Sequence, residues 1–119
     1  MIILYYPKCS TCKKALQYLD ALHLDYEKRD IVLNHPSKEE LKHWQSLNSK
    51  PLTSLFNVNG KKYRELQLKT KLPFMDEDEI YTLLASDGML IKRPLVILDH
   101  QLLIGFKEKE WNQVFKNED

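Results

Sequence analysis

Residues 1–15, MIILYYPKCSTCKKA, contain the strongest indication of the fold. Residues 2–6 are apolar and rich in β-forming side chains, and Pro7 follows them directly, which predicts a short buried strand. Beyond this strand the apolar residues recur at helical spacing, which predicts an amphipathic helix. Cys9 and Cys12, the only cysteines of the chain, lie where the strand gives way to the helix. The first unit of the protein is therefore a strand and a helix joined by a CxxC pair.

The rest of the chain predicts a mixed α/β fold. Residues 24–31 resemble a second strand, and a strand, a helix and a strand within about 30 residues form a βαβ unit with parallel strands. A β-hairpin is predicted near the C-terminus, where two apolar runs flank a polar turn. The expected strands are residues 2–6, 24–31, 94–98 and 102–106, and the expected closing helix is 107–115. This order predicts a single domain over residues 1–119, a thioredoxin-like mixed four-stranded sheet with a helical insertion at about 36–90.

Capping signals mark the helices of the predicted insertion. Ser37 precedes a helical pattern and Glu40 follows three residues later, which is the spacing of a capping box. Asn59-Gly60 predicts a turn before a short helical segment. Gly88 follows a longer helical pattern and is predicted to be its C-terminal cap.

Length and charge exclude several classes of function. The chain has 119 residues, enough for one domain, and its formal net charge of +1 gives no reason to expect binding to nucleic acid or to an acidic membrane. No apolar run approaches the length of a membrane span, and the start lacks the basic segment and cleavage site of a signal peptide. We therefore expect a cytosolic protein, a compartment in which a lone cysteine pair is seldom a permanent disulfide.

The position of Cys9 predicts an activated thiol. Backbone N–H groups at the start of a helix carry partial positive charge and lack intrahelical acceptors, so a thiolate placed there has a lowered pKa. Lys8, Lys13 and Lys14 add positive charge nearby. Cys12 lies one helical turn later on the same face and is expected to be less exposed. Cys9 is therefore the predicted attacking sulfur and Cys12 the resolving one.

The sequence pattern leaves other interpretations of the cysteine pair open. A structural zinc site needs about four ligands, and the histidines after the pair have the wrong spacing for a zinc finger. A structural disulfide that closes so short a loop would constrain the unfolded chain little. Two inert buried thiols are disfavoured because Ser10, Thr11 and lysines surround the pair. A redox pair is favoured, since the CxxC follows a strand in a βαβ unit.

A second candidate site is IKRPLV, residues 91–96. Pro94 can be read as a trans proline that opens an edge strand, where its missing N–H costs least. It can also be read as a cis proline in a loop that faces the CxxC. In the second interpretation the Arg93 backbone offers hydrogen bonds to an incoming thiol, and the Arg93 guanidinium attracts thiolates or carboxylates. The residue pattern alone leaves both interpretations open.

Four blocks of sequence resemble the Spx/ArsC-like family of thioredoxin-fold proteins, in particular its small arsenate reductase-related branch with an N-terminal CxxC. The blocks are YYPKCSTCKKA (5–15), LFNVNGKKYREL (55–66), LLASDGMLIKRPLV (83–96) and LLIGFKEKEW (102–111). The resemblance implies a cis peptide at Arg93–Pro94, a nucleophilic Cys9 and a helical insertion beside the sheet. The expected substrate contacts are Lys8, Thr11, Arg64, Arg93 and Pro94. No resident cofactor is expected; glutathione, or a thioredoxin or glutaredoxin partner, is the expected electron donor.

Two named functions of the family fit the sequence imperfectly. Glutaredoxin-dependent arsenate reductases have one catalytic cysteine, which matches Cys9, and three arginines that hold the oxyanion. Here Arg93 matches one arginine, while the other two positions fall on Asn57 and on Phe106–Lys107. A site without a bidentate arginine clamp is expected to hold arsenate poorly.

Spx-type regulators share the CxxC switch and bind the C-terminal domain of the RNA polymerase α subunit. The glycine that they use at this contact corresponds to Pro51. We therefore expect a thiol–disulfide oxidoreductase, with a redox-switched regulator that binds RNA polymerase as the alternative and an arsenate reductase as a second alternative.

Overall fold

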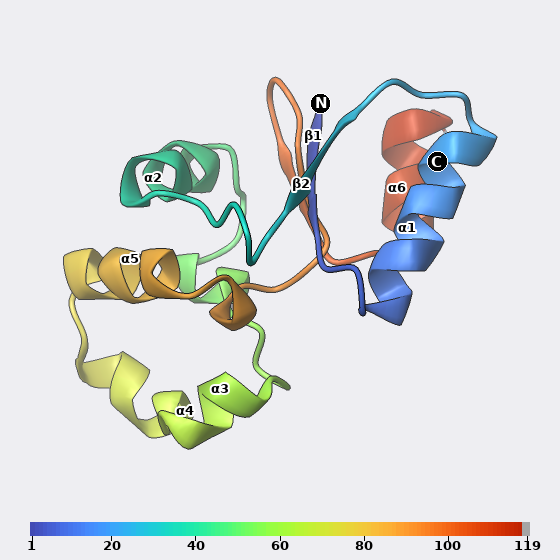
Figure 1. Cartoon of the computed structure of the whole chain (residues 1–119). Coiled ribbons are helices and arrows are strands. Elements are labelled where there is room, and N and C mark those ends of the chain that lie inside the picture. The colour runs from blue at the N-terminus through green and yellow to red at the C-terminus, as the bar shows by residue number, and fades with distance from the viewer. Residues whose placement is uncertain (118–119) are drawn as a thin grey trace.

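A four-stranded mixed β-sheet forms the centre of the computed structural model, which describes residues 1–117 (Figure 1). The strands are β1 (Ile2–Tyr5), β2 (Glu27–Asp30), β3 (Leu95–Ile97) and β4 (Leu102–Ile104), in the order β2-β1-β3-β4. β1 runs parallel to β2 and antiparallel to β3, and β3 is antiparallel to β4. The predicted βαβ unit and C-terminal hairpin are thereby confirmed.

β2 is shorter than the predicted strand at residues 24–31. The preceding helix continues to Ala21, and His23 then adopts a left-handed conformation with φ of 56°. The backbone N–H of Leu24 still bonds to the Leu19 carbonyl, 3.2 Å away. These residues complete the end of the helix, so the strand pairing begins only at Glu27.

Two helices, α1 (Ser10–Ala21) and α6 (Glu108–Phe115), cover one face of the sheet (Figure 1). Successive residues of a strand point to opposite faces, so each strand contributes alternate side chains to this layer. The buried members of the layer are Ile3, Ala15, Leu19, Val96, Leu103 and Trp111. Trp111 is fully buried, and its indole N–H donates to the Gly105 carbonyl at 3.2 Å. This layer fixes the helix that carries the cysteines against the sheet.

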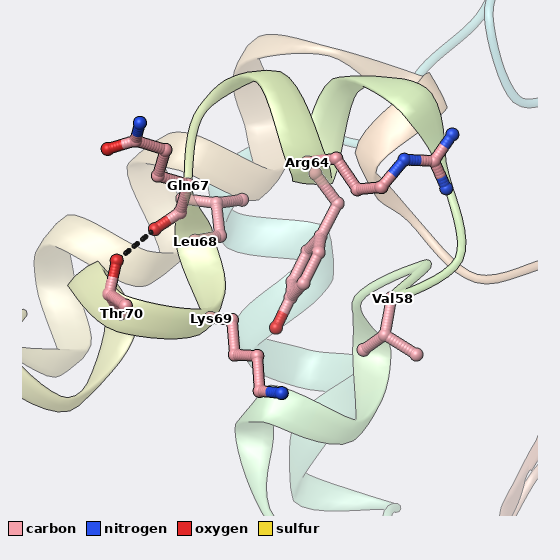
Figure 2. Close-up of a pocket in the computed structure, with 7 residues that line it drawn as sticks. Val58, Arg64, Gln67, Leu68, Lys69 and Thr70 are labelled. Atoms are coloured by element: carbon pink, nitrogen blue, oxygen red, sulfur yellow. Dashed lines mark hydrogen bonds between the residues drawn. The ribbon is translucent and has the colours of Figure 1, made fainter.

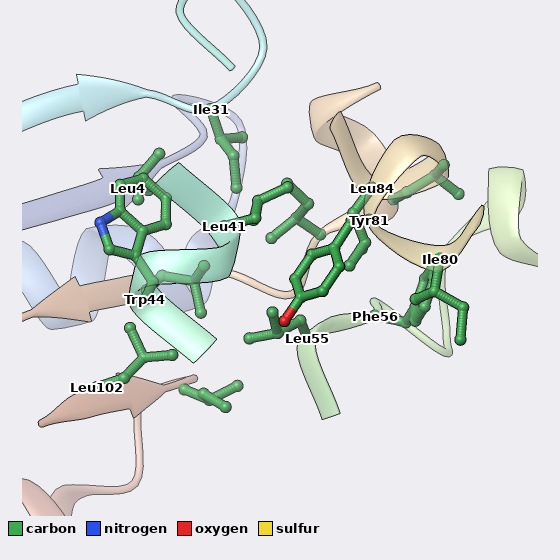
Figure 3. Packing of buried hydrophobic residues seen from close by; sticks show 14 of the residues in the cluster. Leu4, Ile31, Leu41, Trp44, Leu55, Phe56, Ile80, Tyr81, Leu84 and Leu102 are labelled. Atoms are coloured by element: carbon green, nitrogen blue, oxygen red, sulfur yellow. The ribbon is translucent and has the colours of Figure 1, made fainter. Parts of the chain in front are cut away.

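The other face of the sheet is covered by the predicted helical insertion, whose elements run from Lys38 to Leu90. Its elements are α2 (Lys38–Ser46), η1 (Leu52–Leu55), α3 (Lys61–Glu65), α4 (Leu68–Lys71), η2 (Leu72–Phe74), α5 (Glu77–Ser86) and η3 (Gly88–Leu90). Figure 3 shows the buried cluster on this face, which includes Leu4 of β1, Trp44 of α2 and Tyr81 of α5. Within residues 1–117 no helix is long and apolar enough to span a bilayer.

The predicted helix cap at the start of the insertion is confirmed, whereas the one predicted near its end is wrong. The capping box of Ser37 and Glu40 is present at the start of α2. Gly88, however, is not the C-terminal cap of α5, because α5 ends at Ser86 and Gly88 begins η3. A Cβ at Gly88 would lie 1.8 Å from the Ile31 carbonyl oxygen. Gly88 is therefore required by the close approach of two backbone segments.

Two backbone hydrogen bonds join the insertion to the segment that leads into Arg93. The Lys92 N–H donates to the Leu55 carbonyl, and the Asn57 N–H donates to the Leu90 carbonyl, both at 2.8 Å. Phe56 and Ile91 pair between them in an isolated antiparallel bridge. Residues from the middle of the chain are thereby held beside the loop before β3.

Candidate active site

Cys9 is the N-cap residue of α1, as its place in the sequence predicted. Its backbone is extended, with φ −95° and ψ 116°, and its Sγ accepts a hydrogen bond from the Cys12 backbone N–H at 3.3 Å. The Cys9 N–H in turn donates to the Tyr6 carbonyl at 3.0 Å, which closes the turn after β1. The strand, the turn and the helix together hold the sulfur over the positive end of the helix.

The two cysteines are free thiols in unequal surroundings. Cys9 is partly exposed, whereas Cys12 is fully buried. Burial of Cys9 acts to raise its pKa, but hydrogen bonds from the Cys12 side chain and backbone and the charge of Arg93 outweigh this effect, so the pKa of Cys9 is lowered. Burial, and the hydrogen bond to Cys9, raise the pKa of Cys12 to about 12. Cys9 is therefore the thiol that ionises first.

Arg93 provides the cationic side of the site. The Arg93–Pro94 peptide bond is cis, as the resemblance implied. The guanidinium lies over the Tyr6 ring, with Cζ 5.1 Å from the ring centroid, and its charge lowers the pKa of Cys9. Its Nε and Nη1 atoms are buried and have no hydrogen-bond partner in the described part of the chain. Buried donors of this kind are normally paired, so the Arg93 N–H groups can donate to an acceptor on a bound molecule.

A pocket of about 300 Å³ adjoins the Arg93 side chain. It is lined by Asn57, Gly60, Lys61, Lys62, Glu65, Asp87, Met89 and Arg93. The backbone bonds between the insertion and the Arg93 segment bring these distant residues together. The pocket carries three cationic and two acidic side chains, so it can accept an anionic group that the Arg93 guanidinium binds.

The other predicted substrate contacts lie in different parts of the structure. Lys8 and Thr11 are exposed on either side of Cys9, and the Thr11 backbone N–H contributes to the lowered pKa of Cys9. Pro94 is buried, and its carbonyl accepts from the Gly105 N–H at 2.8 Å. Arg64 lines a different pocket and donates from Nη1 to the Asn59 carbonyl at 2.8 Å. A role for Arg64 at the thiol site therefore stays a prediction.

Tyr6 is a site residue that the sequence did not single out. Its aromatic ring supports the Arg93 guanidinium, and its backbone carbonyl anchors the Cys9 turn. The available signal was its place at the end of the first apolar run, directly before Pro7. That signal predicts only a strand end, because Arg93, the partner of the ring, lies far away in the sequence.

The structure also places the positions that correspond to the arginines of arsenate reductases. Asn57 shares the pocket with Arg93. Phe106 packs on Trp111 with ring centroids 4.7 Å apart, and Lys107 is exposed at the start of α6. Arg93 is therefore the one guanidinium among the described residues that line this pocket.

The mixed sheet, with a CxxC pair at the start of its first helix, defines a thioredoxin-like α/β protein. The model of the ArsC family matches residues 4–114, and the chain belongs to this family. A curated relative, the uncharacterized protein YusI of Bacillus subtilis, is 47% identical over 109 residues, which are 92% of each chain. Global transcriptional regulator Spx 2 of Bacillus cereus is 30% identical over 92% of this chain and 83% of its own.

A solved structure agrees with this assignment. The ArsC family related protein from Bacteroides fragilis superposes with a TM-score of 0.91, at 45% identity over 95% of each chain. The similarity thus extends over the sheet and the helical insertion alike. The predicted Spx/ArsC-like family and the thioredoxin-like fold class are both confirmed.

Proposed function

We propose that the protein is a thiol–disulfide oxidoreductase in which Cys9 attacks and Cys12 resolves. The observation that carries this proposal is the contrast between two neighbouring thiols. Cys9 is partly exposed with a lowered pKa, and Cys12 is buried with a pKa raised to about 12. Since the thiolate is the nucleophile, the accessible and more acidic sulfur reacts first.

The proposed reaction transfers two electrons. The Cys9 thiolate attacks one sulfur of a substrate disulfide, whose S–S bond breaks, and the other sulfur leaves as a thiolate that takes up a proton. Cys12 then loses its proton and attacks the Cys9 Sγ, which releases the second substrate thiol and leaves a Cys9–Cys12 disulfide. The substrate is reduced and the cysteine pair is oxidised. Glutathione, or a thioredoxin or glutaredoxin, would supply the electrons that restore the two thiols.

Arg93 supports this proposal from the other side of the site. Its charge favours the thiolate form of Cys9, and two of its buried nitrogen atoms have no acceptor among residues 1–117. A carboxylate close to the substrate disulfide would supply that acceptor. Lys8 and Thr11, exposed beside Cys9, are proposed to contact the substrate on its open side.

Turnover of a mixed disulfide tests the proposal. A glutathionylated peptide is incubated with excess glutathione and the wild-type protein, and release of the free peptide thiol is followed. We expect release well above the rate without protein, complete loss in Cys9→Ser, and near wild-type release in the matched variant Ser10→Ala. Equal release by wild-type protein and Cys9→Ser would contradict the proposal.

A redox-switched transcription regulator is the second candidate, because Spx 2 is similar over most of the chain. The contact position that corresponds to Pro51 is exposed and directly precedes η1. Binding to the isolated C-terminal domain of the RNA polymerase α subunit distinguishes the candidates. An affinity that differs between oxidised and reduced protein favours the regulator; no binding in either state removes this candidate.

Arsenate reduction is disfavoured by the pocket itself. Among residues 1–117, no second guanidinium lines the pocket at Arg93, since Asn57 lies there instead and Phe106 belongs to the aromatic cluster around Trp111. We expect no substantial arsenate-dependent turnover with glutaredoxin and glutathione. Robust turnover that disappears in Cys9→Ser would show that arsenate binds in another way.

A further inference from the structure

A second pocket, the α3–α4 hollow, lies on the helical insertion and has a volume of about 620 Å³. It is lined by Val58, Tyr63, Arg64, Gln67, Leu68, Lys69 and Thr70. None of these residues lines the pocket at Arg93. Figure 2 shows Leu68 and Lys69 of α4 on one side and Val58 across from them. The volume is within the range of binding sites for specific ligands.

The apolar part of the hollow is anchored in the protein core. Leu68 is only 2% exposed and belongs to the core cluster beneath the insertion. The Tyr63 ring packs against Phe56, with centroids 6.0 Å apart, and Phe56 is 1% exposed. Val58, by contrast, is 52% exposed at the rim. The hollow therefore offers an apolar surface whose deeper side chains are already held in place, which reduces the entropy cost of binding.

The charges around the hollow are almost all positive. Residues 61–71 contain five cationic side chains and one acidic one, Glu65. Glu65 pairs with Lys61 at 3.7 Å and does not line the hollow. Within residues 1–117, Lys69 makes no ion pair, and Arg64 donates only to the Asn59 carbonyl. Two cations of the rim are thus available to an acidic ligand.

We propose that the α3–α4 hollow is a docking site for an acidic segment of a partner protein that carries an apolar anchor residue. The anchor contacts Val58, Tyr63 and Leu68, while acidic side chains of the segment pair with Arg64 and Lys69. Most of the lining residues are exposed, so a small ligand would remain largely in water, whereas a protein segment covers both the hollow and its basic surroundings. The proposal goes beyond the proposed function and uses neither cysteine.

Selection from a random 12-residue peptide display library tests this proposal. The target is the full chain with Cys9→Ser and Cys12→Ser, so that no peptide is retained through a disulfide. We expect enriched peptides to combine Asp or Glu with a bulky apolar residue. In amide NMR spectra the best peptide should shift the signals of residues 58–70 and leave the Cys9 turn unchanged.

Charge reversal provides the matched comparison. Arg64→Glu with Lys69→Glu should weaken the best peptide about tenfold or more, since each change replaces an ion pair at the rim with repulsion between like charges. Lys50→Glu with Lys109→Glu, an equal change in net charge on exposed lysines elsewhere, should change the affinity less than about twofold. No enrichment, NMR shifts outside the hollow, or equal weakening by both pairs of variants would overturn the proposal.

Discussion

At the scale of single residues, the site depends on opposing effects at one sulfur atom. Partial burial of Cys9 disfavours its thiolate, and four nearby groups reverse that effect: the Cys12 thiol, the backbone N–H groups of Cys12 and Thr11, and the Arg93 guanidinium. Three of them belong to the same helical turn as Cys9. Arg93 comes from the loop before β3, so the tertiary fold contributes to the acidity of Cys9.

Removal of the Arg93 charge should make Cys9 less acidic. The Cys12→Ser background isolates Cys9 and keeps a hydroxyl donor near its sulfur. There, Arg93→Ala should raise the pKa of Cys9 and slow alkylation by iodoacetamide near neutral pH about two- to fivefold, the effect of losing up to about 1 kcal/mol of charge interaction. Alkylation rates are measured from pH 5 to pH 10.

Arg93→Lys is the control for charge alone. It should recover part of the alkylation rate but little of any binding that needs the planar guanidinium. If Arg93→Ala remains folded and keeps the pH profile of its background, Arg93 has no part in activation of the thiol.

Individual residues also show which parts of the candidate site can be predicted from the sequence. Cys9, Cys12 and Arg93 can be proposed from the sequence because CxxC and X-Pro patterns carry chemical meaning in a short stretch of residues. Tyr6 was missed because its ring contacts Arg93, which is distant in sequence, and no local pattern marks such a contact. Arg64 was grouped with Arg93 by charge and resemblance, yet the fold places the two in different pockets.

At the level of helices and strands, a partly buried ion pair connects the sheet to the insertion. Arg29 of β2 donates two hydrogen bonds to the Glu40 carboxylate of α2, at 2.6 and 2.9 Å, and lies 5.7 Å from the centre of the Trp44 ring. The hydrogen bonds from Arg29 are the main cause that lowers the pKa of Glu40 to about 2. This pair positions the first helix of the insertion on β2.

The pH dependence of stability should reveal this ion pair. Because the folded-state pKa of Glu40 is depressed, its contribution is present above the ordinary pKa of about 4.3 and is lost as the pH falls through the folded value of about 2. Glu40→Gln keeps a side chain that can complete the capping box. It should lower the free energy of unfolding at pH 7 by about 1–2 kcal/mol. This loss is smaller than the full pKa shift would give, because the Glu40 side chain is 38% exposed. Urea unfolding is measured from pH 7 to pH 2.

Glu39→Gln is the matched control, since Glu39 lies in the same helical turn and is exposed. Its unfolding free energy should stay within about 0.5 kcal/mol of wild type. Glu40→Gln and wild type should converge toward pH 2. A constant difference between them at every pH would mean that the loss comes from packing and not from the charge.

Substitution of Gly88 tests whether glycine is needed where the end of the insertion approaches the segment after β2. Gly88→Ala would place a Cβ 1.8 Å from the Ile31 carbonyl oxygen, and this contact can be relieved only by moving backbone. We expect a loss of at least about 1–3 kcal/mol in unfolding free energy, the usual cost of overpacking. Thermal and urea unfolding both measure it.

Gly60→Ala provides the comparison for that substitution. Its Cβ would meet the end of the Asn57 side chain at 2.8 Å, which can rotate away, and the Asn57 carbonyl oxygen at 3.1 Å. The expected loss is therefore smaller. If Gly60→Ala costs as much as Gly88→Ala, the close approach at Gly88 is not the reason for glycine there.

At the scale of the whole molecule, the sheet separates two cores with different origins in the sequence. One lies beneath α1 and α6 and the other beneath the insertion (Figures 1 and 3). The strands and the βαβ unit were predictable because their apolar pattern is local. The path of residues 48–75 was not, because this segment is held by contacts to η3 and by backbone hydrogen bonds to the segment that leads into Arg93. The α3–α4 hollow arises in that unpredicted part.

Intact mass spectrometry can show directly whether Cys9 attacks and Cys12 resolves. Glutathione disulfide is added at pH 7 to wild-type protein, to Cys12→Ser and to Cys9→Ser. Samples are quenched with acid at intervals, and their intact masses are measured. We expect Cys12→Ser to stop as a glutathione adduct on Cys9, wild type to pass through this adduct to an internal disulfide, and Cys9→Ser to stay unmodified. Faster adduct formation on Cys12 in Cys9→Ser than on Cys9 in Cys12→Ser would show that the roles of the two cysteines are not those proposed.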